Sequence, residues 1–236
     1  MMQRIPEPEL MESAPQVSAY ASADFSETDA SVLTRLAALV RQFGLEPSED
    51  DVLVDLGCGP GNISERLHRR WPMCQVIGLD GADAMLGAAR SRQADLAGSD
   101  SHLQYRRAGL AELAMHGWHA VADVGGTEAA LVISNSLLHH LHNPHQLWQA
   151  MLKLSRPGAV VMHRDLRRPA SAQEALALRE RYLPEAPDVL RRDYLASLHA
   201  AFTVEEVRAQ LDQLGLSALR VEAVADRYLE VTGRLD

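Results

Sequence analysis

The sequence predicts an α/β domain with a mostly parallel sheet and helices on both of its faces. Two observations carry this prediction. Short continuous apolar runs alternate with stretches of helical periodicity through the middle of the chain, and the runs are bounded by turn residues. Strands that are apolar throughout are typical of a sheet buried on both faces. The 236 residues are enough for one such domain with a sizeable core.

The first strands and helices alternate in order. Apolar runs predict strands at residues 52–55, 75–79, 102–107, 129–134 and 159–163. Helical spacing predicts helices at residues 31–43, 62–71, 82–96 and 145–154, and Pro157-Gly158 closes the last of them. Helices between consecutive buried strands are the usual connections of a parallel sheet.

The two ends of the chain differ from this pattern. Residues 1–30 are polar and acidic with three prolines, and predict an arm or lid over the domain, with disorder as the alternative. Residues 31–236 form the domain, with a helical, arginine-rich insert at 167–201 near the end of the fifth strand. Thr203 and Glu206 form a capping-box pattern for a helix to about residue 214. Residues 219–224 and 228–231 then predict a closing strand pair.

Composition excludes several classes of function. The net charge of −9 disfavours a nucleic-acid partner, because such proteins usually carry a basic excess. Two cysteines are too few for a disulfide framework. There is neither a signal-peptide pattern nor a segment of about 20 apolar residues, so we expect a cytoplasmic protein without a membrane partner. The oligomeric state does not follow from the sequence.

The most informative motif is VLVDLGCGPGN at residues 52–62. A buried strand ends in Asp55, and Gly57, Gly59 and Gly61 follow before a helix begins. Such glycines let the backbone turn sharply and approach a ligand closely, and the helix N-terminus favours an anionic group. The pattern departs from the dinucleotide motif G-x-G-x-x-G, because Asn62 stands where the third glycine belongs.

A second motif, VIGLDGADAML at residues 76–86, places Asp80 at the end of the second strand. Its two carboxylate oxygens can accept both hydroxyls of a ribose, and the alternative is a simple helix cap. A third motif, LVISNSLLHHLHNP at residues 131–144, follows the fourth strand. Together, in this order, these motifs resemble the class I S-adenosylmethionine-dependent methyltransferases over residues 51–165, about half the chain.

The resemblance implies a Rossmann-like methyltransferase fold, with a seven-stranded sheet and an antiparallel last strand. It also implies S-adenosyl-L-methionine as the cofactor, with S-adenosyl-L-homocysteine as product, and a small-molecule acceptor. By this resemblance the cofactor-binding residues are Asp55, Gly57, Cys58, Gly59, Asn62, Asp80, Gly81, Met85, Gly109, Leu110, Asn135 and Ser136. Gly109 departs from the family pattern, which has an acid there for the adenine amino group, so we expect backbone contacts at Gly109 and Leu110 instead.

Methyl transfer is an in-line displacement, so the enzyme mainly positions the reactants. A base helps where the acceptor is a hydroxyl or an ammonium group. His140 is the candidate catalytic residue, as base or substrate anchor, because its position is similar to that of a histidine in some small-molecule members of the family. Further candidate substrate contacts are Tyr20, His139, Arg164 and Tyr194.

Four histidines, at 139, 140, 142 and 145, suggest a metal site, but no fixed carboxylate or thiolate accompanies them and adjacent side chains should diverge. We therefore predict no metal. Three other functions stay open: a protein or peptide methyltransferase, a non-catalytic cofactor-binding protein, and a nicotinamide-dependent oxidoreductase. The acceptor atom (O, N, S or C) does not follow from the sequence.

Overall fold

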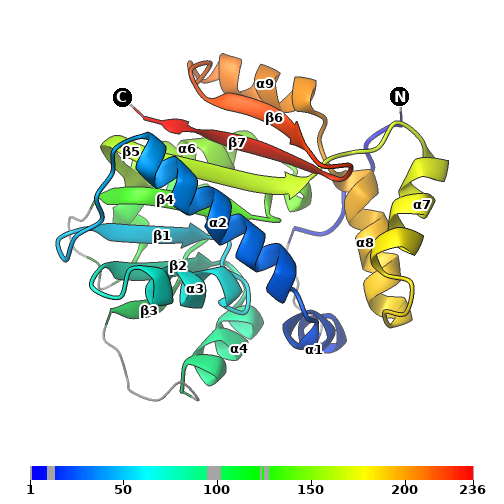
Figure 1. The fold of residues 1–236 in the computed structure, drawn as a ribbon, viewed down its shortest axis with the longest axis horizontal. Coiled ribbons are helices and arrows are strands. Elements are labelled where there is room, and N and C mark those ends of the chain that lie inside the picture. Colours follow the sequence, from blue (N-terminus) through cyan, green and yellow to red (C-terminus); the bar gives the residue numbers. More distant parts are fainter. Residues whose placement is uncertain (1, 10–13, 95–101, 123, 125–127, 236) are drawn as a thin grey trace.

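A single seven-stranded sheet forms the centre of the molecule (Figure 1), in a computed structural model that describes residues 2–9, 14–94, 102–122, 124 and 128–235. The strand order is β3-β2-β1-β4-β5-β7-β6. The strands are β1 (Val52–Leu56), β2 (Gln75–Asp80), β3 (Leu103–Arg107), β4 (Ala129–Asn135), β5 (Ser155–Leu166), β6 (Arg220–Val224) and β7 (Tyr228–Arg234). Only β7 runs against the others, since it pairs antiparallel with both β5 and β6. The predicted fold class is confirmed.

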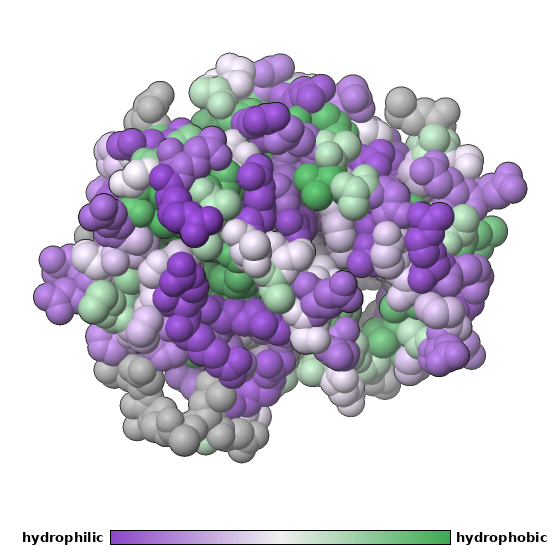
Figure 2. Space-filling view, in the orientation of Figure 1, coloured by the Kyte–Doolittle hydropathy of each residue, from purple (hydrophilic) through white to green (hydrophobic). Residues whose placement is uncertain are grey.

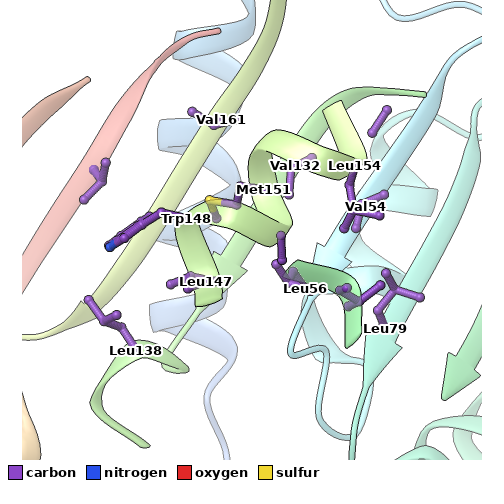
Figure 3. Close-up of a cluster of buried hydrophobic side chains, with 14 of the residues drawn as sticks. Val54, Leu56, Leu79, Val132, Leu138, Leu147, Trp148, Met151, Leu154 and Val161 are labelled. Carbon is purple, nitrogen blue, oxygen red and sulfur yellow. The ribbon is translucent and has the colours of Figure 1, made fainter. Parts of the chain in front are cut away.

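Helices cover both faces of this sheet because successive side chains of each buried strand point to opposite faces. Leu53 of β1 joins a core with α2 (Ser26–Gln42), α3 (Asn62–Arg70) and α4 (Asp83–Ala94). Val54 joins the second core, with α5 (Leu110–His116), α6 (His145–Leu154) and α9 (Val204–Gln213). In Figure 3, Trp148 and Met151 of α6 pack over the strands of this second core.

Several element boundaries differ from the prediction. The fifth strand is twelve residues long rather than 159–163, and it starts directly after α6, so Pro157-Gly158 lies inside β5 instead of closing the helix. The strand continues beyond its apolar run because β7 pairs with it from Val160 to Leu166. Helix α2 starts at Ser26, so the predicted boundary at residue 30 falls inside a helix. Residues 95–96 of the predicted helix 82–96 lie outside the described residues.

The remaining helices gather at the carboxyl ends of the strands. Helices α7 (Ala172–Tyr182) and α8 (Asp188–Ala200) form the region of the predicted insert, and α1 (Ala14–Ser22) lies between α4 and α8 (Figure 1). The described residues also include two short 3-10 turns, η1 (Gly117–Ala120) and η2 (Leu138–His140). None of the helices in the described ranges is both long and apolar enough to cross a membrane.

Candidate cofactor and acceptor site

The glycine loop joins β1 to α3 and is held against β2. The backbone N–H groups of Gly57 and Cys58 both donate to the carbonyl of Leu79, at 2.8 and 3.0 Å. Gly57, Gly59 and Gly61 have φ angles of +75°, +52° and +86°, which non-glycine residues rarely adopt. A Cβ at Gly59 would meet no atom within 4 Å. The loop is therefore rigidly shaped, with open space in front of its centre.

Asp80 closes the other side of this space at the end of β2. Its Oδ2 accepts the N–H of Gly59 and its Oδ1 accepts the N–H of Ala82, both at 2.8 Å. Burial raises the pKa of Asp80, although the backbone N–H bonds partly oppose that rise. Each carboxylate oxygen keeps a further lone pair. The side chain is thus fixed with free acceptor capacity for two hydroxyls.

Asp55 lies beneath the loop and is buried. The hydroxyl of Ser64 donates to its Oδ2 at 2.6 Å. Burial raises the pKa of Asp55 from 3.8 to about 7, and the nearby Asp80 adds to this rise. A positively charged ligand group next to Asp55 would favour its ionised form.

The other predicted cofactor residues differ in burial and in their place in the fold. Met85 is buried and packs with Ala82, Val17 and Tyr20, so helix α1 covers this end of the site. Gly109 caps the start of α5. Gly81, Leu110 and Asn135 are half-buried at strand ends or helix starts.

Two of the predicted cofactor residues, Asn62 and Cys58, make their side-chain contacts within the protein. The side-chain oxygen of Asn62 accepts a hydrogen bond from Arg92, which also pairs with Glu65. Cys58 is buried, and burial raises the pKa of its thiol, which keeps it protonated. The Cys58 side chain therefore packs beneath the loop and does not serve as a nucleophile.

The loop after β4 meets the glycine loop directly. A Cβ added at Gly57 would lie 2.7 Å from Cδ2 of Leu137, and the φ of +75° is one that only glycine adopts readily. The preceding residue, Ser136, has φ +55°, and its N–H donates to the carbonyl of Arg164 in β5 at 2.9 Å. A strained non-glycine backbone of this kind is held in place by its surroundings and is common at functional sites.

His139 and Asp165 form a buried pair beside Ser136, and we call these three residues the acceptor corner. Nδ1 of His139 is hydrogen-bonded to Oδ1 of Asp165, and the backbone N–H of His139 donates to Oδ2 at 3.1 Å. Burial disfavours charge on both groups, but their mutual attraction outweighs it. The pKa of His139 is consequently raised, and the pKa of Asp165 is held well below its usual range.

The candidate catalytic residue, His140, lies next to this pair. Its ring centroid is 4.2 Å from that of His139, and its Nδ1 is 3.3 Å from Oε1 of Glu7. Burial, and then the charge on His139, lower the pKa of His140 to about 3. His140 is therefore a neutral imidazole with an available lone pair but weak basicity.

Arg164 and Tyr194 occupy different surroundings from the acceptor corner. Arg164 and Asp165 are consecutive in β5, so their side chains leave opposite faces, and Arg164 pairs with Glu230 and donates to Ser31 Oγ at 2.7 Å. Tyr194 of α8 is half-buried, and burial raises the pKa of its hydroxyl to about 12. Tyr194 packs with Leu195 and Tyr228 in the cluster formed by α7 and α8. The structure thus places neither Tyr194 nor the charge of Arg164 in direct contact with the acceptor corner.

Helix α1 brings Tyr20 over the centre of the site. Burial raises the pKa of the Tyr20 hydroxyl, and the charges of Asp29, Asp165 and Asp80 add to this rise. Its ring also stacks at 4.8 Å on that of Phe25. In Figure 2 the surface is hollowed between α2 and α8, next to this helix. Tyr20 therefore lies on the cofactor side, where it packs with Ala82 and Met85.

Sequence reasoning missed two contributors to the site. Asp165 is not among the predicted site residues, although it is hydrogen-bonded to His139. Glu7 supplies the carboxylate that the histidine cluster was expected to lack, and the rings of His139 and His140 lie together instead of diverging. The order of parallel strands gives a signal for Asp165, since the ends of β4 and β5 are adjacent. No local pattern marks Glu7.

Known proteins share both the sequence and the fold of this chain. Trans-aconitate 2-methyltransferase of Escherichia coli O157:H7 (strain EC4115 / EHEC) is 29% identical over 111 residues, which are 47% of this chain and 37% of that enzyme. The Yersinia pseudotuberculosis enzyme of the same name is 33% identical over 107 residues, 45% of this chain and 35% of its own length. The chain thus matches little more than a third of these relatives.

Solved structures resemble the whole domain at low identity. The plantazolicin methyltransferase BpumL, crystallised with S-adenosylhomocysteine and a pentazolic substrate analogue, aligns over 93% of this chain and 90% of its own, with TM-score 0.67 and 12% identity. An S-adenosylmethionine-dependent methyltransferase from Aquifex aeolicus aligns over 96% and 100%, with TM-score 0.62 and 14% identity. These likenesses show the fold.

A family model described as a methyltransferase domain matches residues 28–220. This range includes the glycine loop, Asp80 and the acceptor corner. The family predicted from the sequence is therefore confirmed, and the predicted enzyme class and methyl donor agree with it. The chain belongs to the methyltransferase-domain family.

Proposed function

We propose that this protein transfers a methyl group from S-adenosylmethionine to a small-molecule acceptor. The contact between Gly57 and Leu137 carries the proposal, because it places the glycine loop directly beside the loop of the acceptor corner. A donor held by the glycine loop and Asp80 would then present its sulfonium end toward Ser136 and His139. In-line displacement needs little beyond this alignment.

The acceptor would bind between the sheet edge and the helices α1 and α8. Tyr20 and Tyr194 supply aromatic surface there, and the buried Asp165 supplies negative charge. His140 is neutral, so it fits better as a hydrogen-bonding anchor for the acceptor than as a strong base. His140→Ala should raise KM for the acceptor more than it lowers kcat. Full activity of this variant would remove His140 from the site.

The trans-aconitate relatives suggest a carboxylic acid as the acceptor to test first. An ionised carboxylate needs no base, which fits the weak basicity of His140. Residues 156–194, which include most of the insert, carry eight arginines against six acidic residues. Several of them are in ion pairs, including Arg191 with Glu180 and Arg168 with Glu206. The excess of arginine therefore does not by itself favour an acidic acceptor.

The alternatives predict different binding behaviour. An oxidoreductase would bind NAD, but its usual nucleotide-binding sheet is all parallel, whereas β7 here is antiparallel. A non-catalytic member would bind S-adenosylhomocysteine without ever consuming the donor. A protein methyltransferase would consume the donor with peptide acceptors only.

Calorimetric titration with S-adenosylhomocysteine and with NAD separates these cases. We expect binding of S-adenosylhomocysteine alone, weakened at least tenfold in Asp80→Ala, because the variant loses the acceptor for both ribose hydroxyls. Asp83→Ala is the matched control, since Asp83 is exposed and pairs only at the surface with Arg107. Binding of NAD, or equal effects of the two variants, would contradict the proposal.

A donor-consumption assay against small carboxylic acids, phenols, amines and peptides then tests the activity. Production of S-adenosylhomocysteine with one small-molecule class supports the proposal. Consumption with peptides alone would favour the protein methyltransferase. No consumption with any class, together with tight cofactor binding, would favour the non-catalytic alternative.

A further inference from the structure

The N-terminal residues 2–9, which we call the strap, run across the loop after β4 and reach α8. The N–H groups of Met2 and Ile5 donate to the carbonyls of Ala170 and His199 at 3.1 and 3.0 Å. The guanidinium of Arg4 donates to the carbonyl of Leu141 at 2.9 Å and stacks 4.0 Å from the centre of the Phe202 ring. These contacts fix the strap over the acceptor corner and place Glu7 there.

We propose that Glu7, His139 and His140 bind one divalent transition-metal ion of the zinc class. Oε1 of Glu7 lies 3.5 Å from Nε2 of His139 and 3.3 Å from Nδ1 of His140. The three ligand atoms all lie within 4.8 Å of one another. Bonds of about 2.0–2.1 Å in a tetrahedral site separate neighbouring ligand atoms by roughly 3.4 Å. The two measured separations from Glu7 match this value.

The groups behind the ligands are those that a metal site requires. Asp165 accepts a hydrogen bond from His139 Nδ1, which leaves the lone pair of Nε2 directed at Glu7. A carboxylate behind a ligating histidine is the usual arrangement in zinc sites. The hydroxyl of Ser197 donates to Glu7 Oε1 at 3.0 Å and restrains the carboxylate. Nδ1 of His140 is buried and has no hydrogen-bond partner among the residues that the structure describes.

The charges around the site also suit a dication. Glu7 and Asp165 contribute two negative charges to a largely buried corner, which two neutral imidazoles do not compensate. Two other titratable groups lie at this corner. The guanidinium of Arg4 donates to the carbonyl of His139 at 3.1 Å, and Nε2 of His163 is 3.5 Å from Asp165 Oδ2. Without a metal, His139 lies between the two carboxylates and is hydrogen-bonded to Asp165. The corner is thus either a metal site or a metal-free cluster of histidines and carboxylates, and the two cases differ by one bound ion.

Three protein ligands leave one tetrahedral position open, as in catalytic zinc sites. This position is at the carboxyl ends of β4 and β5, where the proposed function places the acceptor. An oxygen or nitrogen atom of the acceptor could occupy it and lose its proton more readily. This last step rests on the proposed function, whereas metal binding itself does not.

His142 and Glu9 provide matched controls. His142 Nε2 is bonded to the backbone carbonyl of Glu7, its side chain is exposed, and its N–H donates to Glu9 at 2.7 Å. Glu9→Gln and His142→Ala therefore change the same strap and loop without removing a proposed ligand. Glu7→Gln and His140→Ala each remove one.

The test is titration of chelator-treated, full-length protein with Co²⁺, followed by visible absorption, and with Zn²⁺, followed by calorimetry. We expect one equivalent of metal with the intense bands of tetrahedral Co²⁺. Glu7→Gln and His140→Ala should weaken binding roughly 100-fold or more, beyond the effect of second-shell changes. Glu9→Gln and His142→Ala should bind as the unaltered protein does.

Absence of stoichiometric binding, or equal binding by Glu7→Gln and His140→Ala, would overturn the metal site. In either case the corner is a metal-free cluster in which His139 is hydrogen-bonded to Asp165. Affinity for S-adenosylhomocysteine serves as the folding check for each variant, since Asp80 and the glycine loop lie outside the proposed site. It also separates failure of this inference from failure of the proposed function.

Discussion

Binding of the cofactor should be linked to loss of a proton from Asp55. Burial raises the pKa of this carboxyl to about 7, so roughly half of the free molecules carry the proton at pH 7. The glycine loop that follows Asp55 is expected to hold the methionine part of the cofactor, which carries an ammonium group. A cation at this place lowers the pKa of Asp55 well below 7.

The size of this effect follows from the two ionisation states. If only the ionised form binds, the apparent affinity changes by the ratio of ionised fractions, which is about tenfold between pH 6 and pH 8. About 0.5 proton should be released per bound cofactor at pH 7, and almost none above pH 8.5. Stability of the free protein has the opposite trend, since a raised pKa means that stability is lost as the pH rises from 3.8 toward 7.

Calorimetry with S-adenosylhomocysteine in two buffers of different ionisation enthalpy measures the released proton directly. Asp55→Asn is the matched variant, because its side-chain oxygen can still accept the Ser64 hydroxyl. This variant should bind more weakly, with a flat pH dependence between pH 6 and pH 8. Equal proton release by Asp55→Asn and the unaltered protein would refute the assignment to Asp55.

Four further substitutions test other parts of the reasoning. Gly61→Ala should lower the free energy of unfolding by about 1–3 kcal/mol, because φ is +86° and the new Cβ would collide with Tyr105. Gly87→Ala in α4 has open space around the new Cβ and should raise the free energy of unfolding by about 0.5–1 kcal/mol. Denaturant titration measures both changes. Tyr20→Ala should weaken binding of S-adenosylhomocysteine several-fold by loosening α1, and unchanged affinity would show that α1 is not a lid. Thr203→Ala removes the capping box of α9 and should cost about 1 kcal/mol of stability without altering cofactor affinity.

The core of the fold could be predicted because local patterns determine it. The run at residues 129–134 is apolar on both faces, and only a strand between two helical layers buries all of it. The strand end and the three glycines likewise mark the cofactor loop within a few residues. The start of α2 was predicted too late because its first turn contains Glu27 and Asp29, which suit a helix N-terminus but break the apolar pattern.

The acceptor side could not be predicted in the same way, because its partners are distant in sequence. Glu7 lies more than 130 residues before His139, and only the path of the strap joins them. The alternation of β5 did contain one usable signal. Consecutive strand residues point to opposite faces of the sheet, so Arg164 and Asp165 are not expected to share a pocket. Because β5 pairs with β4, Asp165 lies next to the end of β4.

The strand order explains why these two parts of the site meet. β1 is flanked by β2 on one side and by β4 on the other, so the chain reverses direction across the sheet at β1. Loops leave this point in opposite directions and open a crevice at the carboxyl ends of the strands. The glycine loop fills one side of the crevice and Leu137 closes on it from the other, at a position where the φ of +75° favours glycine. The fold alone therefore fixes where a donor and an acceptor can meet. The strap and α1, which come from before the first strand, lie beside that point, and their contacts with η2, α8 and α4 join the two ends of the domain there.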